Sequence, residues 1–538
     1  MHSLKAPTRR LVSQQEAAII EAAHIPRSRF LNRWTRTTAF DQGYLVPFMV
    51  EEILPGDHMK YNIIAYVRVD TLLFPIFGQL RLDTFIFYVP SRILWTNFVR
   101  MMGEQTNPSD TIAYTCPVMT VNNLDVGSIF DHMGLQTTGQ TTNSHDVNAL
   151  PFRAYNKIYN AWFRDENIIN TVTENTGDTG DDTADYQMQK RAKAHDYFTS
   201  ALPWAQKFTA PATPLSGTAP VKGIGIAGGT ATTNVSANFF ETPGGAAVAY
   251  PNYYDFGPAI AADKYAIKAD GSQGNLQIFA DLSQATGVTI NAFRQAFMIQ
   301  ALLERDARGG TRYVELLKSH FGVTSPDFRL QRPEYIGGGQ STLNVTPIAQ
   351  TAPTTGVPLG ALGAAGTSAG QHRASYAATE HGYIIGLINV RSELKYQQGL
   401  HRMYTRSTRY DFYWPALALM GEQAVLRGEI YKTGASANDN VVFGYQPRWE
   451  EYRQRYSDVT GIMKSTAAST LDAWHTGQKF TSAPTLSQTF IEDTAPMSRL
   501  LAAGTAANGQ QFRAEILIER DAVRPIPLHG TPALLGRF

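Results

Sequence analysis

Two glycine motifs in the sequence have the form that enzymes use for catalysis or cofactor binding. Residues 366–370 (GTSAG) match the G-x-S-x-G elbow that presents a nucleophilic serine, and residues 223–228 (GIGIAG) match the G-x-G-x-x-G dinucleotide fingerprint. The elbow needs an apolar strand before it and a helix after it, and the fingerprint needs a strand–turn–helix unit. Both motifs lie instead in tracts of glycine, alanine and threonine, where such matches arise by chance. We therefore predict neither an enzyme nor a bound cofactor.

Carboxylates, histidines and cysteine offer no better site. Asp178, Asp181, Asp182 and Asp185 cluster in the segment TGDTGDDTAD, but their spacing does not match a calcium-binding EF-hand loop. We predict a solvated acidic loop there. The sequence has no H-E-x-x-H motif and no paired Cys/His set, and its single cysteine is Cys116. It thus predicts no metal site and no internal disulfide.

Residues 1–36 are strongly basic and could bind phosphate. Their only acidic residues are Glu16 and Glu21, whereas their cations are Lys5, Arg9, Arg10, Arg27, Arg29, Arg33 and Arg36. Such side chains neutralise phosphates without reading bases. Basic arms also tie neighbouring subunits together, and the sequence alone leaves both interpretations open. We predict an extended arm over residues 1–36 with one short helix near residues 13–22.

The chain as a whole carries no basic field. Its formal net charge over 538 residues is +1, which argues against a protein that attracts nucleic acid through its entire surface. Charged residues make up 17% and apolar residues 43%, so we expect a large core and extensive uncharged contact surfaces. We find no signal peptide and no run of about 18 apolar residues, and we therefore expect no membrane insertion.

Two segments of low charge have the composition of insertions. Residues 208–262 hold only three charged residues but several aromatic ones. Flexible linkers lack aromatic residues, so part of this segment should fold or pack against a copy of itself. The aromatic residues expected at such a contact are Phe239, Phe240, Tyr250, Tyr253, Tyr254 and Phe256. Residues 337–371 carry no charge, which predicts a long surface loop over residues 337–378.

Apolar patterns predict the elements that would position these surfaces. Strands are expected at residues 44–50, 61–69, 82–90, 383–391, 408–415 and 512–520. Residues 82–90 are apolar on both faces, so this strand should be covered on both sides. Amphipathic spacing predicts helices at residues 154–166, 289–310 and 312–322. Short strands separated by long excursions favour an antiparallel β-sandwich with large insertions.

Long motifs in the sequence resemble one known family over nearly the whole chain. They include IPRSRF (25–30), FDQGYLVPFMVEEILPGD (40–57), FGQLRLDTFIFYVPSRILWTNF (77–98), GEQTNP (103–108), ALPFRAYNKIYNAWFRDEN (149–167), FGYQPRWEEYR (443–453) and RPIPLHGTP (524–532). They are similar to the major capsid proteins of the gokushovirus branch of the Microviridae, which are small phages with single-stranded DNA. The resemblance implies a mainly β fold, namely an eight-stranded antiparallel jelly roll (a viral capsid β-sandwich). This single domain, residues 37–538, would carry long loop insertions containing a few helices.

The same resemblance implies a function and a set of partners. About 60 copies in equivalent environments would form a T=1 icosahedral shell around a circular single-stranded DNA genome. Residues 208–275 would form an outward-projecting insertion that attaches to a host surface receptor such as a glycan. A small basic DNA-binding viral protein, a scaffolding protein and a DNA pilot protein would be further partners. Assembly would occur in the host bacterial cytoplasm, with the virion as the final location.

One alternative from another functional class remains open. A β-sandwich carbohydrate-binding protein or a glycosidase would use the aromatic segment as a platform for sugars. It would be a monomer or a small oligomer that binds glycans in solution, whereas a capsid protein would form shells.

Overall fold

The computed structural model divides the chain into two compact units. One unit comprises Met1–Ala205 and Val323–Phe538, and the other comprises Gln206–Gly322. The described residues are 27–107, 109–138, 143–211, 221–227, 237–241, 246–251, 253–256, 265–268, 278–280, 290–310, 313–322, 331–349, 351, 360–502 and 510–528. Each unit has its own sheet and its own cluster of buried apolar side chains.

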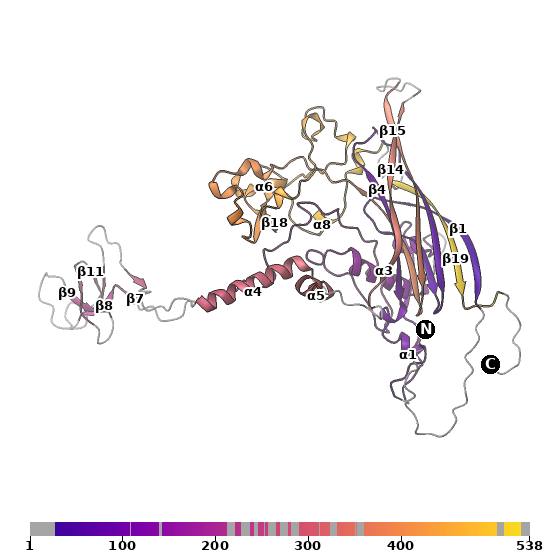
Figure 1. The fold of residues 1–538 in the computed structure, drawn as a ribbon, viewed down its shortest axis with the longest axis horizontal. Helices are drawn as coiled ribbons and strands as arrows, with labels where there is room; N and C mark the ends of the chain where they lie inside the picture. Colours follow the sequence, from indigo (N-terminus) through magenta and orange to yellow (C-terminus); the bar gives the residue numbers. More distant parts are fainter. Residues whose placement is uncertain are drawn as a thin grey trace. The chain divides into compact units, whose positions relative to one another are not determined.

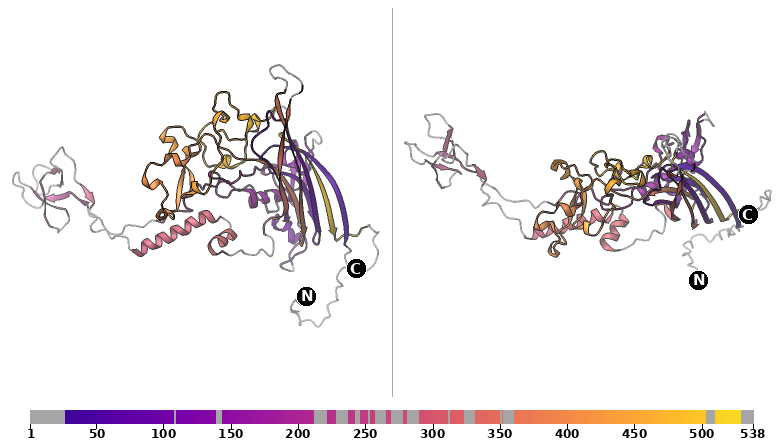
Figure 2. Two further views of the ribbon diagram at one scale, coloured as in Figure 1. Left: turned by 45° about the horizontal axis from the view of Figure 1, so that its top comes forward. Right: turned by 90° about the horizontal axis from the view of Figure 1, so that it is seen from above.

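Eight antiparallel strands form the main sheet of the first unit (Figure 1). In chain order they are β1 (Ser28–Phe40), β2 (Val46–Ile53), β3 (His58–Val69), β4 (Leu80–Pro90), β14 (Glu334–Ala349), β15 (Leu362–Ala377), β16 (Gly382–Ser392) and β19 (Phe512–Arg524). In space they follow the order β1-β19-β3-β15-β14-β4-β16-β2. Figure 2 shows them side by side as a curved array.

The pairing of these strands is nested. The first of the eight pairs with the last, the second with the seventh, the third with the sixth and the fourth with the fifth. Further ladders join β19 to β3 and β16 to β4, and the β14–β15 hairpin connects the two halves. A chain that doubles back on itself and then rolls up gives this order, which is the jelly-roll topology. The expected eight-stranded antiparallel fold is confirmed.

Strands β3 and β4 show how the sequence specifies this roll. Strand β3 buries every second side chain in the main core, as a strand with one covered face does: Met59, Tyr61, Ile63, Ala65, Val67 and Val69. Strand β4 instead sends Leu82 and Ile86 into that core, and Phe87 and Val89 into a second apolar cluster on its other side. The prediction that residues 82–90 are covered on both faces is confirmed.

The connection after β4 supplies this second cluster. Within the first unit it contains η1 (Ser91–Ile93), α1 (Phe98–Met101), β5 (Val118–Val121), α2 (Ile129–Met133), β6 (His145–Asn148), α3 (Leu150–Ile158), the π-helix η2 (Tyr159–Phe163) and η3 (Thr183–Asp185). Side chains of α3 pack with those of β4 and β16 in the cluster. The helix expected at residues 154–166 is confirmed, although it begins earlier, at Leu150, and ends at Phe163.

The connection between β16 and β19 packs against residues 169–201 of the earlier connection in a third apolar cluster. Its elements are η5 (Arg402–Thr405), η6 (Arg409–Asp411), η7 (Pro415–Leu417), β17 (Glu422–Leu426), α6 (Arg427–Ile430), α7 (Ser436–Asp439), β18 (Val442–Pro447), η8 (Glu450–Tyr452), η9 (Gly461–Met463), η10 (Asp472–Trp474), α8 (Gln488–Ile491) and η11 (Met497–Arg499). The prediction of a strand at residues 408–415 is wrong, because the short 3-10 helices η6 and η7 form there instead. Aromatic residues favour strands only where a paired, half-buried surface exists.

Two further expectations from composition are wrong. The described part of residues 337–378 is not a long surface loop, because residues 337–349 belong to β14 and residues 362–377 form β15. Their glycines and alanines disfavour strands in general, but small residues are needed where backbones approach closely. Residues 28–36 of the expected arm belong to β1, which pairs with β19 along its whole length. Residues 1–26, with the helix expected near residues 13–22, lie outside the described residues.

The second unit contains a small sheet and two helices. The sheet has the order β10-β9-β8-β12-β11, from the strands β8 (Ile224–Ala227), β9 (Ala237–Phe240), β10 (Val248–Tyr250), β11 (Tyr253–Phe256) and β12 (Tyr265–Lys268). Strands β7 (Val221–Lys222) and β13 (Phe279–Ala280) form a separate ladder. Helices α4 (Ile290–Gly309) and α5 (Tyr313–Phe321) confirm the two helices predicted there. No helix in the described part of the chain is long and apolar enough to cross a bilayer.

Candidate assembly and nucleic-acid surfaces

The arginines predicted to bind phosphate already have partners within the chain where the structure describes them. Lys5, Arg9 and Arg10 lie outside the described residues. Arg27 donates from Nη2 to the carbonyl oxygen of Gly56 at 2.8 Å. This bond ties the start of β1 to the turn between β2 and β3.

Arg29 and Arg33 lie on the exposed face of β1, opposite carboxylates of β19. Arg29 donates two hydrogen bonds of 2.7 Å to Asp521, and Arg33 lies 3.5 Å from Glu519. The hydrogen bond from Arg29 holds the pKa of Asp521 below its ordinary value. Both guanidinium groups stay accessible, with 63% and 68% of their side chains exposed, but each has a neutralising partner. They therefore offer little net charge to a polyanion.

Arg36 has a structural position on the other face of β1. Its Nη2 donates to the carbonyl oxygens of Asp131, at 3.2 Å, and of His132. It thereby ties the end of helix α2 to the edge strand of the roll. The described part of the expected arm is thus a charged strand edge.

The aromatic residues expected at a contact between copies divide into two groups. Phe239 and Tyr250 are buried and stack with their ring centroids 4.7 Å apart, and the Tyr250 hydroxyl donates to Glu241 at 2.9 Å. These two rings stabilise the small sheet itself. Phe240 is 37% exposed. Tyr253, Tyr254 and Phe256 form most of β11, and a contact between copies stays a prediction for them.

The apparent catalytic motif has a structural explanation. Ser368 lies in the middle of β15 and is buried inside the roll, with neither the turn nor the exposure that a nucleophile needs. Close by, His372 Nδ1 lies 2.6 Å from Thr84 Oγ1 and its Nε2 lies 3.0 Å from Ser341 Oγ. Burial lowers the pKa of His372, so a neutral ring with both nitrogens engaged is favoured. No local sequence pattern predicts this group, because its members come from the three strands β4, β14 and β15.

The acidic cluster is solvated as predicted at Asp178 and Asp182, which are exposed, but not at Asp181. Asp178 accepts hydrogen bonds from Trp95 Nε1 at 2.6 Å and from Asn97, and Asp181 is fully buried against Arg153. A buried carboxylate needs a cation and hydrogen-bond donors, and this loop closes over both. In the described part of the chain, no three His, Cys, Asp or Glu side chains are arranged to hold a metal ion.

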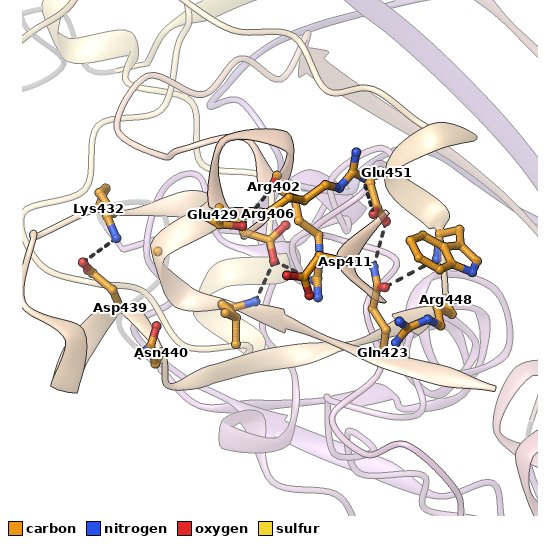
Figure 3. A pocket seen from close by; sticks show the side chains of 14 residues that line it. Arg402, Arg406, Asp411, Gln423, Glu429, Lys432, Asp439, Asn440, Arg448 and Glu451 are labelled. Atoms are coloured by element: carbon orange, nitrogen blue, oxygen red, sulfur yellow. Dashed lines mark hydrogen bonds and ion pairs between the residues drawn. The ribbon is translucent and has the colours of Figure 1, made fainter. Parts of the chain in front are cut away.

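A pocket of about 270 Å³ lies among the elements from η5 to η8, in the connection between β16 and β19 (Figure 3). Its floor is Glu429, which is 4% exposed and accepts hydrogen bonds from Arg402 at 3.1 Å and from the Tyr197 hydroxyl at 2.9 Å. Burial raises the pKa of Glu429. On another side of the pocket, Arg406 donates to Glu451 at 2.9 Å.

The remaining charges of this pocket are also compensated. Asp439 accepts hydrogen bonds from Thr433 and Gly434 and an ion pair from Lys432, which together hold its pKa well below the ordinary value. The hydrogen bonds from Thr408 and Ser407 lower the pKa of Asp411 to about 2. These carboxylates are therefore ionised acceptors with fixed partners. They act as a scaffold that fixes the backbone and offer no base for proton transfer.

A second hollow, of about 540 Å³, combines aromatic walls with cations. Phe87, Trp162 and Tyr335 line it, and their ring centroids are 5.6–6.3 Å apart. Arg191 closes one side, over the ring of Phe85 at 4.7 Å. Such walls can hold a planar aromatic group. Sequence reasoning missed this site because η2, β4, β14 and the segment after residue 190 meet only in the fold.

Comparisons with known proteins match the chain to one family over nearly all its length. The profile of the family described as "Capsid protein (F protein)" matches residues 18–534. The chain is 43% identical to capsid protein VP1 of Bdellovibrio phage phiMH2K, over 98% of this chain and 99% of that protein. It is also similar to capsid protein VP1 of Chlamydia phage 1 (35% identical) and of Spiroplasma virus 4 (33% identical), each over 96% of this chain and 97% of the relative.

Proposed function

This chain belongs to the phage F capsid protein family, as a gokushovirus-like capsid protein of the Microviridae, and from that premise we propose how it works in the virion. About 60 copies form a T=1 icosahedral shell around a circular single-stranded DNA genome. Residues 208–275, which lie within the second unit, provide a surface protrusion that attaches to a host receptor such as a glycan. The chain is a structural component of the capsid and not an enzyme.

The observation that carries this proposal is the match between this chain and a capsid protein over nearly the full length of both. The nested jelly roll supports it, because strands in such a roll are covered while its long connections are left to contact neighbours. A closed shell of identical subunits requires that each copy meets its neighbours through the same surfaces. A carbohydrate-binding protein on the same sandwich would need none of these repeated contacts.

Electron microscopy of the expressed chain tests the proposal. Purified particles should be closed shells about 25–30 nm across, a size set by packing about 60 jelly rolls. A stable monomer that binds glycans and forms no shells under any assembly condition would favour the carbohydrate-binding alternative. Co-expression with the small basic protein and the scaffolding protein proposed as partners, and with the DNA pilot protein, covers the case that assembly needs them.

The basic arm supplies a testable part of the DNA contact. Replacing Lys5, Arg9 and Arg10 together with glutamine should reduce the DNA content of purified particles, because phosphate neutralisation would be lost. The matched control replaces Arg29 and Arg33 with glutamine. Since these two already face carboxylates at the surface, that variant should leave the unfolding free energy nearly unchanged and keep more DNA. Unchanged DNA content in the first variant would point to an arm that only ties subunits together.

Removal of the small sheet tests the attachment role. Val221 pairs with Ala280 across the β7–β13 ladder, so a short Gly-Ser linker can replace Val221–Ala280 without separating the chain ends. The shortened chain should still form shells, because the jelly roll uses none of these residues, but particles should no longer adsorb to host cells. Adsorption at the original level would refute the attachment role, and loss of shells from a folded chain would show that the sheet serves assembly.

A further inference from the structure

An unusual number of large apolar side chains is exposed in the connection between β16 and β19. Most lie in residues 403–420, and one lies in η8. We define the aromatic surface as these nine residues, with their exposed fractions: Met403 43%, Tyr404 69%, Tyr410 67%, Phe412 52%, Tyr413 48%, Trp414 43%, Leu419 99%, Met420 56% and Tyr452 56%. Scattered exposed apolar residues are normal, but a contiguous group of this kind marks a contact site.

The rings of this surface are held in place by arginines. Arg409 lies over the Trp414 ring, 4.9 Å from its centroid, and Trp414 Nε1 donates to the Arg409 carbonyl oxygen at 3.1 Å. Arg406 lies over the rings of Tyr452, at 4.6 Å, and Phe412, at 5.9 Å. Side chains fixed in this way lose little conformational freedom when a partner covers them.

The charged pocket beneath fixes the backbone of the same segment. Arg402 is anchored on Glu429, and Arg406 on Glu451, so both arginines at the start of the segment are tied to buried carboxylates (Figure 3). Asp411 caps the turn η6 through the backbone N–H groups of Ser407 and Thr408. The exposed rings therefore lie on a rigid support.

The composition of the surface identifies the class of partner. Residues 403–420 contain aromatic residues, methionine and arginine but neither lysine nor glutamate, which is the composition of the centre of a protein–protein interface. A single-stranded nucleic acid would also stack on rings, but it needs cations free to meet phosphates. Here Arg402 and Arg406 are paired with carboxylates, and Arg409 lies over the Trp414 ring. The fully exposed Leu419 gains only from burial against another apolar surface.

We propose that the aromatic surface is buried against a second copy of this chain in the capsid. This inference rests on the proposed shell function and names one of the surfaces through which the shell closes. The exposed parts of its nine side chains amount to roughly 1,100 Å², taking about 200 Å² for a large side chain. That area is enough for the roughly 800 Å² which each partner contributes to a standard stable interface. A surface of this size accounts for one whole contact between subunits.

Two substitutions test this proposal in the full chain. Leu419→Glu places a charge where the side chain is fully exposed in the single subunit, so the subunit should fold as before. In the shell, the same charge would be buried without a partner, and the yield of shells should fall about tenfold or more. Trp414→Ala should lower the yield in the same way, whereas Trp414→Phe should retain most of it. Val126→Glu, at a residue that is 78% exposed outside the aromatic surface, is the matched control and should assemble as the original chain does.

The outcomes separate this inference from the proposed function. Shells at full yield from both Leu419→Glu and Trp414→Ala would overturn the inference while leaving the shell function intact. Normal shells with reduced DNA would overturn it in favour of a nucleic-acid surface. Absence of shells from the original chain and from Val126→Glu would instead count against the proposed function. Hydrogen exchange gives a second measurement, because residues 403–420 should be protected in shells relative to unassembled subunits, and equal exchange in both would contradict the proposal.

Discussion

Asp181→Ala should lower the unfolding free energy of the unassembled chain by about 3–5 kcal/mol, because it leaves the Arg153 guanidinium buried without its counter-charge. Both side chains are almost completely buried, and Arg153 donates two hydrogen bonds of 2.8 Å to Asp181. Tyr186 and Asn175 donate to the same carboxylate. Denaturant titration of the original and variant chains measures the difference.

This prediction has a pH dependence with a defined sign. Burial alone would raise the pKa of Asp181, but the hydrogen bonds from Arg153 and Tyr186 outweigh it and hold the pKa below its ordinary value. The contribution of the ion pair is therefore fully present near neutral pH and is lost as the pH falls through that lowered pKa. The gap in stability between the original chain and Asp181→Ala should narrow in acid, and a gap independent of pH would contradict the assignment.

Asp182→Asn is the matched control in the same loop. Asp182 is exposed and caps η3 by accepting a hydrogen bond from the backbone of Ala184, a role that asparagine fills equally well. The change in stability should stay within about 0.5 kcal/mol. If Asp181→Ala and Asp182→Asn lowered the unfolding free energy equally, the loop would be uniformly solvated, as its composition indicates.

The difference between these two neighbours shows what sequence reasoning cannot resolve. Four aspartates in a glycine- and threonine-rich stretch have the composition of a solvated loop, and nothing local separates Asp181 from Asp182. The partner of Asp181 lies on α3, 28 residues earlier, and only the fold brings the two together. Burial of charge is a long-range property of the fold, which local composition does not report.

Strand positions were predicted best where apolar residues alternate over a long stretch. The strand expected at 512–520 is confirmed as β19, with Phe512, Ala514, Ile516 and Ile518 buried. Their alternation is a local property that survives in any sheet with one covered face. The aromatic strand expected at 408–415 failed for the opposite reason, because its rings contact neither a paired strand nor a core in the single chain.

The phosphate-binding surface predicted for the N-terminal region shows a similar limit. Counting charges correctly found a basic N-terminal region, but it did not reveal that Arg29 and Arg33 face Asp521 and Glu519, nearly 500 residues away in sequence. The register of β1 with β19 determines this compensation. The number of arginines thus predicts where phosphate contact is possible. The pairing of β1 with β19 decides how much positive charge stays uncompensated there.

Gly338→Ala should destabilise the chain by at least about 2 kcal/mol and reduce the yield of folded protein. Gly338 lies in β14 with a φ of +147°, and a Cβ atom there would lie 2.2 Å from the carbonyl oxygen of Thr84 on β4. Gly337 has a similar conformation, beside a register shift in the same ladder. Gly338 thus lets the fourth and fifth strands of the roll pair closely, and Gly337 does the same for the fifth and sixth strands, where a Cβ atom would lie 2.5 Å from the carbonyl oxygen of Arg373. An added methyl group at Gly338 must push β14 and β4 apart.

Gly363→Ala, in the partner strand of the same hairpin, separates this effect from a general sensitivity of glycine-rich strands. A Cβ atom at Gly363 would have its nearest neighbour 3.6 Å away, which is an ordinary contact. Alanine there also restricts the unfolded chain, so stability should stay the same or rise by up to about 1 kcal/mol. Thermal and denaturant unfolding of both variants tests the contrast. Equal losses of unfolding free energy in the two variants would mean that the composition of the hairpin matters more than its geometry. The expected contrast would show that Gly338, one of the glycines that led sequence analysis to predict a loop at β14, is required for the pairing of that strand.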